Sequence, residues 1–112
     1  MRTLLLGLSI IGTLVSLPAI ADDRIGYAQI RAGDYSAAER MIQAERRIYP
    51  NKPELLLNLA VVYNRTGREK EASTLYRRVL AQPEVMLDTA TDSMSSYAVA
   101  RAGLGQTDFA SR

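Results

Sequence analysis

Few side chains in this sequence have the types and spacing that catalysis requires. Asp88 and Asp92 lie four residues apart and would share one face of a helix, as the two carboxylates of an acid/base pair can. An isolated acidic pair of this kind is more often a helix cap beside a solvated loop. The sequence contains no histidine, so the commonest general base and the commonest metal ligand are both absent. These features indicate a protein that is not an enzyme and that uses no metal or other cofactor.

Two features could bind phosphate groups, and each has a simpler structural explanation. The Gly-Leu-Gly run at residues 103–105 is too short, and too close to the terminus, for a phosphate-binding loop. The arginine pairs at residues 46–47 and 77–78 fall late in segments that read as helices, where positive charge is favourable near the negative end of the helix dipole. No stacking aromatic residues are interleaved with these pairs, so we expect no binding of nucleic acid.

The N-terminal segment has the pattern of an export signal at residues 1–21. Arg2 precedes an apolar run from Leu4 to Leu17, which is shorter than the roughly 20 residues of a membrane-spanning helix. Small residues then flank position 20, and we expect a signal peptidase to cleave between Ala21 and Asp22. The alternative is an uncleaved segment that keeps the protein tethered to the membrane.

The mature chain would be small and nearly neutral. Cleavage leaves 91 of the 112 residues, enough for one domain with a thin core. Removal of Arg2 leaves 13 basic against 12 acidic residues, a net charge near +1 that gives no reason to attract nucleic acid. The absence of cysteine excludes disulfides and the lipid-attached cysteine of a bacterial lipoprotein. We therefore expect an exported, periplasmic protein with no membrane contact after cleavage.

Small and apolar residues recur at an interval of 34 residues. This interval separates Gly33 from Gly67 and Ala38 from Ala72. A fixed period of this length indicates stacked structural repeats. Further pairs at the same offset are Ile25 and Leu59, Gly26 and Ala60, Met41 and Leu75, and Ile42 and Tyr76.

Each repeat unit reads as two helices joined at its glycine, because glycine adopts the left-handed conformation that ends a helix without steric cost. In the first unit we expect helices at residues 24–32 and 36–48. In the second, Pro53 begins a helix that Gly67 ends, and a partner helix stops before Pro83. The inward-facing residues of the second unit follow helical spacing and are Leu56, Leu59, Ala60, Tyr63, Ala72, Leu75, Tyr76, Val79 and Leu80.

The repeat pattern weakens after residue 83. We expect an irregular connection over residues 84–92, whose apolar part folds back onto the second unit. Asp92 or Ser93 is a suitable cap for a last helix, which would close near one of the glycines at 103 and 105. Residues 106–112 are expected to be frayed.

The repeated residues resemble the tetratricopeptide repeat (TPR) family. Its pattern places a large residue, Leu, a small residue and Tyr along a first helix, Gly at the turn, Ala and an aromatic residue along a second helix, and Pro at the close. The second unit matches at Leu56, Leu59, Ala60, Tyr63, Gly67, Ala72, Tyr76 and Pro83, and the first at Ile25, Gly26, Ala28, Gly33, Ala38, Ile42 and Pro50.

The resemblance implies an all-α fold, a short α-α superhelix of TPR-like helix pairs with a C-terminal capping helix after the signal peptide. The first repeat, shortened at its N-terminus, would occupy residues 22–50, and the second would occupy residues 51–84. The connection, the capping helix and the frayed C-terminus would take up residues 85–112.

The resemblance also implies a binding surface. TPR proteins generally bind partners on a concave side lined by the first helix of each pair, which would carry Tyr27, Ile30, Arg31, Leu57, Val61, Asn64 and Arg65 in this chain. An extended or helical partner segment with apolar anchors and an acidic group would suit this surface. The alternative is that Ile30, Leu57 and Val61 cover the core or pack against the capping helix.

Two classes of function follow. The favoured one is a non-catalytic protein–protein interaction module of the bacterial cell envelope, with an unidentified protein or peptide as its partner. The second is a structural protein that forms a homodimer through its incomplete helix stack, because two repeats are fewer than the three that an independent solenoid normally needs.

Overall fold

A computed structural model describes residues 25–89 and 91–110 of the chain. Its elements, in chain order, are α2 (Tyr27–Arg31), α3 (Tyr35–Arg46), α4 (Pro53–Arg65), α5 (Glu69–Leu80), β1 (Met86–Asp88), β2 (Ser93–Ser95) and α6 (Ser96–Ala110). The expected signal at residues 1–21, with its cleavage site between Ala21 and Asp22, lies outside the described residues. Within the described part, none of the helices combines the length and the apolar character needed to cross a membrane.

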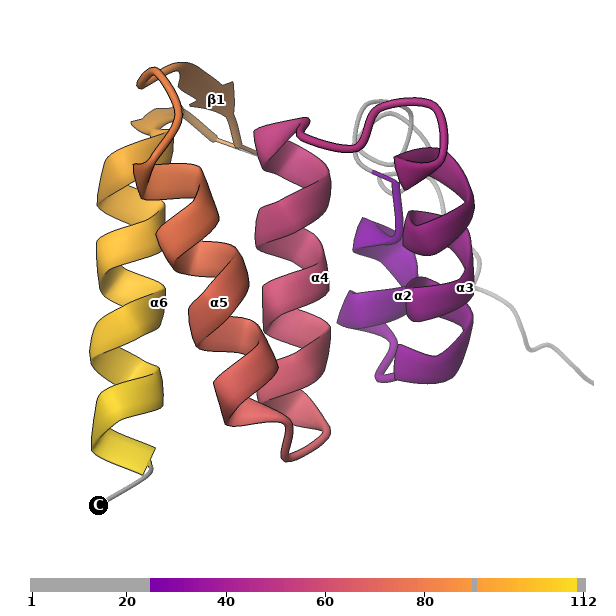
Figure 1. Ribbon diagram of the computed structural model, residues 1–112. Helices are drawn as coiled ribbons and strands as arrows, with labels where there is room; N and C mark the ends of the chain where they lie inside the picture. Colours follow the sequence, from indigo (N-terminus) through magenta and orange to yellow (C-terminus); the bar gives the residue numbers. More distant parts are fainter. Residues whose placement is uncertain (1–24, 90, 111–112) are drawn as a thin grey trace, which may run out of the picture.

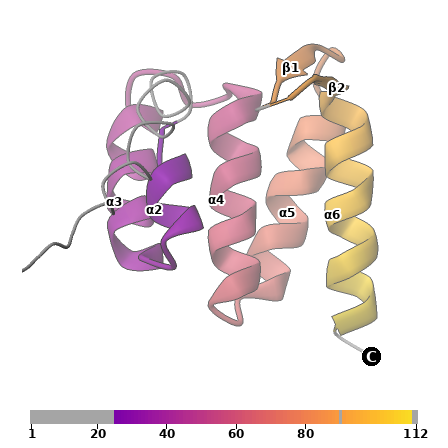
Figure 2. The ribbon, with the colours of Figure 1, turned by 180° about the vertical axis from the view of Figure 1, so that it is seen from behind.

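The helices stack side by side, and consecutive helices run in opposite directions (Figure 1). Helices α2, α4 and α6 lie on one side of the stack, and α3 and α5 lie on the other (Figure 1 and Figure 2). Helix α4 packs against α3, α5 and α6, and α5 packs against α6. The expected all-α superhelix of two helix pairs and a last helix is therefore confirmed.

The two turn glycines explain why each unit folds as a helix pair. Gly33 and Gly67 have φ angles of 79° and 78°, in the left-handed region that glycine adopts without a steric penalty. After the first of these turns, the Asp34 carboxylate accepts a hydrogen bond from the Ala37 N–H at 3.2 Å and so caps α3. The 34-residue period thus repeats a complete unit of helix, turn and helix.

Small residues lie where the helices approach one another. Ala38, Ala60 and Ala72 are fully buried, as the repeat register predicts. Larger apolar side chains such as Leu56 and Leu59 fill the space beside them and are also fully buried. Most of the apolar residues that recur in register between the two units therefore lie in the core, with Met41, which is 41% exposed, as an exception.

The first helix pair differs from expectation at its ends. Helix α2 begins at Tyr27, three residues later than expected, because Gly26 has a left-handed φ of 83° that is incompatible with a continuing α-helix. A side chain at Gly26 would also collide with Ile42, whose Cδ1 atom would lie 2.8 Å from an added Cβ. Helix α3 ends at Arg46 rather than near residue 48, and residues 47–48 form a turn.

The connection after α5 is a β-hairpin rather than the irregular segment that we expected. Strands β1 and β2 pair in antiparallel register, with Leu87 opposite Met94. Of the apolar residues Val85, Met86 and Leu87, which we expected to fold back, only Leu87 is buried in the core, and the other two are exposed. The hairpin lies close to the first turns of α4 and α6 (Figure 1).

The last helix is capped by Ser95 and not by Asp92 or Ser93. The Ser95 hydroxyl oxygen accepts hydrogen bonds from the backbone N–H groups of Tyr97 at 3.0 Å and Ala98 at 3.3 Å. Pairing of β2 with β1 keeps residues 93–95 extended, so the helix can begin only after the strand ends.

The expected end of α6 near residue 103 or 105 is also wrong, because the helix continues to Ala110. Gly103 is a packing residue here: an added Cβ would lie 2.2 Å from Cζ of Tyr76 on α5. The glycine inside α6 therefore allows the close contact with α5. From the sequence alone, such a glycine cannot be distinguished from one that ends a helix.

Candidate interaction surface

The seven residues of the expected binding surface belong to α2 and α4, which lie with α6 on one side of the stack. We call this side the α4 face and define it by Tyr27, Ile30, Arg31, Glu54, Leu57, Asn58, Val61, Asn64 and Arg65, together with Val99 and Thr107 of α6. Helices α2, α4 and α6 run in the same direction across it (Figure 1). The first turns of these three helices therefore lie at one end of the face, and their last turns lie at the other end.

Helix α2 contributes a tyrosine–arginine pair. The Tyr27 hydroxyl accepts a hydrogen bond from Nη1 of Arg31 at 3.1 Å, and the guanidinium carbon lies 5.8 Å from the centre of the ring. Tyr27 is half-buried and Arg31 is exposed. Ile30, between them in sequence, is half-buried and packs against the core. Helix α2 therefore offers an aromatic ring and a cation at neighbouring positions.

The apolar residues of α4 are less accessible than the polar ones. Leu57 is only 4% exposed and belongs to the core, and Val61 is half-buried. Leu57 lines a small cavity together with Leu87 of the hairpin and Val99 of α6. This position thus fits the alternative interpretation, in which Leu57 covers the core, better than an open contact surface.

The last turn of α4 connects to α6 and to α3. The Thr107 hydroxyl has two acceptors within hydrogen-bond distance, Gly103 O of its own helix at 2.9 Å and Oδ1 of Asn64 at 3.1 Å, and the second of these links α4 to α6. Arg65 is exposed, and its Nη1 donates to the Tyr35 hydroxyl at 3.3 Å. Burial raises the pKa of the nearby Tyr76 phenol, and Asn64 and Arg65 oppose this shift. Asn64 is therefore occupied by contacts within the chain, whereas most of the Arg65 guanidinium is accessible.

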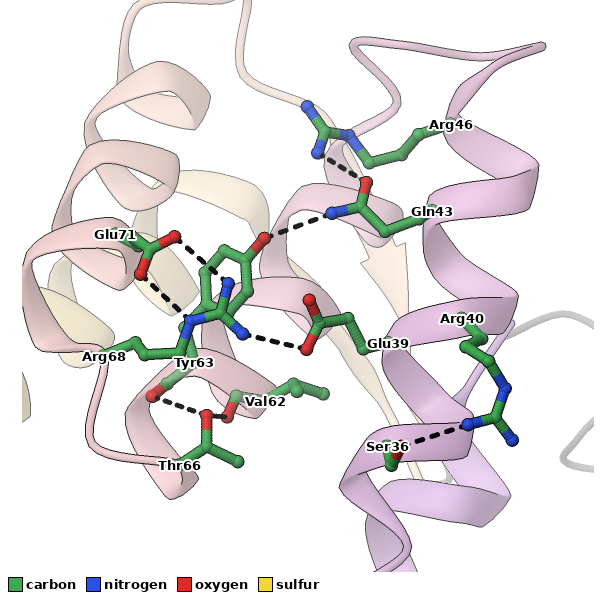
Figure 3. A network of polar contacts seen from close by, with 10 residues as sticks. All are labelled: Ser36, Glu39, Arg40, Gln43, Arg46, Val62, Tyr63, Thr66, Arg68 and Glu71. Carbon is green, nitrogen blue, oxygen red and sulfur yellow. Dashed lines mark hydrogen bonds and ion pairs between the residues drawn. The ribbon is translucent and has the colours of Figure 1, made fainter.

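A polar network joins the two repeats on the other side of α4 (Figure 3). Arg68 forms ion pairs with Glu39 of α3 and Glu71 of α5, each with an N–O distance of 2.9 Å. Its guanidinium carbon lies 4.0 Å from the centre of the Tyr63 ring, and the Tyr63 hydroxyl accepts a hydrogen bond from Gln43 at 3.1 Å. The hydrogen bond to Glu71 raises the pKa of Arg68, and the same bond lowers the pKa of Glu71.

A cavity of about 120 Å³ opens on the α4 face where α4, β1 and α6 meet. Its lining combines three apolar side chains with two carboxylates, an amide and a hydroxyl: Leu57, Leu87, Val99, Glu54, Asp88, Asn58 and Thr89. This site could not be predicted from the sequence, because only the hairpin brings residues 87–89 next to the first turns of α4. No group of three or more acidic residues that could hold a metal ion occurs in residues 25–89 and 91–110.

Comparison with known protein families identifies the architecture independently. The model of the tetratricopeptide repeat family matches residues 29–85, which is just over half of the chain. This chain belongs to the tetratricopeptide repeat family. No curated protein and no solved structure gives a significant match to it. TPR domains are typically non-catalytic modules for protein–protein interaction, and that coarse function applies here.

Charge is distributed unevenly along this TPR stack. Glu54 and Asp88 lie at the end of the α4 face where α4 begins. Arg31 and Arg65 are the last residues of α2 and α4 and lie at the opposite end (Figure 1). The α4 face is therefore acidic at one end and basic at the other.

Proposed function

We propose that this TPR protein is an interaction module of the bacterial cell envelope and that it binds a segment of a partner protein on the α4 face. The main support is the set of cations on that face. Arg31 and Arg65 form no ion pair with any other residue of the described ranges, whereas Arg68, on the other side of α4, is paired twice. Cations that the fold leaves unpaired can bind the acidic group of a partner.

The geometry suggests how the basic end of the α4 face would bind. Each guanidinium has five N–H donors, and Nη1 of Arg31 and of Arg65 each donate to a tyrosine hydroxyl. The remaining donors can bind a carboxylate in the two-pronged arrangement that arginine favours. Tyr27 beside Arg31 adds a rigid aromatic surface of the kind that anchors interfaces.

The envelope location rests on the N-terminal sequence. Its short apolar run and the small residues before Asp22 support export and cleavage after Ala21. The alternative is a protein that stays tethered to the membrane by residues 1–21. The mass of the protein isolated from its native host distinguishes these two outcomes.

In-cell photocrosslinking tests the binding surface. Arg65 is replaced by a photoreactive phenylalanine analogue, and the matched control carries the same analogue at Arg78, which is exposed on α5 in the other layer. We expect an adduct with another protein from position 65 and none from position 78. Mass spectrometry identifies the adduct. Adducts from position 78 alone would contradict the proposal.

A second candidate function is self-association through α6. No further helix follows α6 in the described chain, and its exposed outer side is formed by Ala98, Arg101, Ala102, Gly105 and Gln106. Small residues allow a helix of a second copy to approach closely. Size-exclusion chromatography with light scattering tests this candidate, because a monomer at all concentrations would exclude it.

A further inference from the structure

We propose that the cavity between α4, β1 and α6 receives an aliphatic side chain of the partner that is adjacent to a lysine or arginine. This inference rests on the proposed function, because it concerns the chemistry of the segment that the α4 face binds. The proposed partner segment would thus carry a basic residue in addition to the acidic group that Arg31 and Arg65 lead us to expect.

The interior of the cavity is apolar and of limited size. Leu57 and Leu87 are 4% and 7% exposed, and Val99 is half-buried beside them. Apolar cavities of about 150 Å³ hold one benzene molecule. A volume of about 120 Å³ therefore has room for one leucine-sized or isoleucine-sized side chain but not for a tryptophan.

The hairpin extends this apolar area towards solvent. Met94 lies directly opposite Leu87 in the antiparallel pair, so both side chains lie on the same face of the hairpin. Met94 is 44% exposed. Methionine adapts its shape readily to different partners, so Met94 is suited to cover a side chain seated beside Leu87.

The rim of the cavity carries two carboxylates without a cation. Glu54 is half-buried and forms no hydrogen bond or ion pair within residues 25–89 and 91–110, and Asp88 has one long contact, 3.5 Å from the Ser93 hydroxyl. The lining contains no lysine or arginine. Placement near the positive end of the α4 dipole accounts for Glu54, but Asp88 lies in a strand and has no such explanation.

Charge complementarity therefore favours a basic residue next to the seated side chain. At the other end of the face, Arg31 and Arg65 favour an acidic residue. A partner segment with both features would bind in one direction only, with its basic residue at the start of α4 and its acidic residue at the end of α4.

Titration with synthetic peptides, followed by NMR of the ¹⁵N-labelled protein purified after export, tests the inference. Three capped hexapeptides are identical except for their two central residues. These residues are Leu-Lys in the first peptide, Leu-Glu in the second and Ser-Lys in the third. We expect the Leu-Lys peptide to bind tightest and to shift the amide signals of Leu87, Asp88 and Thr89. The other two peptides should bind about three-fold weaker or not at all.

Two conservative variants test the role of the carboxylates. Glu54→Gln and Asp88→Asn should each weaken binding of the Leu-Lys peptide about three-fold and reduce its advantage over Leu-Glu. The matched control is Glu69→Gln, because Glu69 is also an acidic residue in the first turn of a helix. This control should leave binding unchanged.

Equal binding of the Leu-Lys and Leu-Glu peptides would overturn the inference. So would an absence of shifts with all three peptides, or shifts confined to residues outside the cavity. The proposed function is judged separately by the crosslink from position 65, which does not depend on the cavity. A crosslinked partner together with a negative titration would mean that the face binds a segment of different chemistry.

Discussion

The two sides of α4 differ in how their charged groups are used. On the side towards α3 and α5, Arg68 is paired with Glu39 and Glu71 and packs on Tyr63. On the α4 face, Arg31 and Arg65 have no ion pair among the described residues. The first arrangement joins one repeat to the next. The second leaves two arginines without an ion pair among the described residues, and this difference is the basis for our proposal that the α4 face binds a partner.

The largest change in stability is expected at the contact between α5 and α6, which holds α6 in its place beside α4. Gly103→Ala should lower the free energy of unfolding by about 2–3 kcal/mol, because the added methyl group collides with the Tyr76 ring. Gly105→Ala is the matched control. Its added Cβ meets nothing within 4 Å, so this change should be neutral or stabilise by up to about 1 kcal/mol. Urea denaturation followed by circular dichroism measures both, and equal effects would contradict the packing.

A smaller loss is expected at the contact between α4 and α6. Thr107→Val removes the hydroxyl that is shared between Gly103 O in its own helix and Oδ1 of Asn64 on α4, while it keeps the shape of the side chain. Thr107 is buried, so we expect a loss of about 1 kcal/mol in the free energy of unfolding. Thr74→Val serves as the control, because the hydroxyl of exposed Thr74 donates only to Lys70 O, the counterpart of the bond from Thr107 to Gly103 O. A larger loss from the control would show that the Asn64 contact does not hold α6.

The ion pairs on the other side of α4 should make stability dependent on pH. The hydrogen bond to Arg68 lowers the pKa of Glu71 in the folded protein. A depressed folded-state pKa gives stability that is present above the unfolded value of 4.5 and is lost as pH falls through the lower folded value. Arg68→Met should lower the midpoint of urea denaturation at pH 7 and flatten this acid dependence. An acid dependence identical to that of the wild type would exclude Arg68 as its source.

The smallest effect on stability is expected from the exposed arginines of the α4 face. Arg31→Ala and Arg65→Ala should each change the free energy of unfolding by less than about 0.5 kcal/mol, because neither side chain forms an ion pair within the described chain. Their midpoints in urea should stay close to that of the wild type. A large loss for either variant would mean that the face serves mainly to hold the stack together.

The repeat register made much of the fold predictable from sequence. Ala38 and Ala72 recur at one offset because each lies where two helices cross, and such positions tolerate only small residues. Gly33 and Gly67 likewise signal their turns. Gly103 misled the prediction of the end of α6, because its role depends on Tyr76, which lies 27 positions earlier in the sequence.

The candidate site was less predictable than the fold. The TPR resemblance named Tyr27, Arg31 and Arg65 as surface residues, and their binding role stays a prediction, but it could not show that Leu57 is buried. That depends on the hairpin, whose three-residue strands are too short to leave a clear alternating pattern. The cavity beside Leu57 was missed for the same reason.

The most direct test of the binding surface compares two double variants that lose the same charge from opposite sides. Calorimetry measures the affinity of the partner identified by crosslinking for Arg31→Ala/Arg65→Ala and for Arg77→Ala/Arg78→Ala, whose arginines are exposed on α5. Loss of two charge-assisted contacts should weaken binding at least about ten-fold in the first variant, with a change of less than about two-fold in the second. Equal losses, or a greater loss in the second variant, would contradict binding on the α4 face.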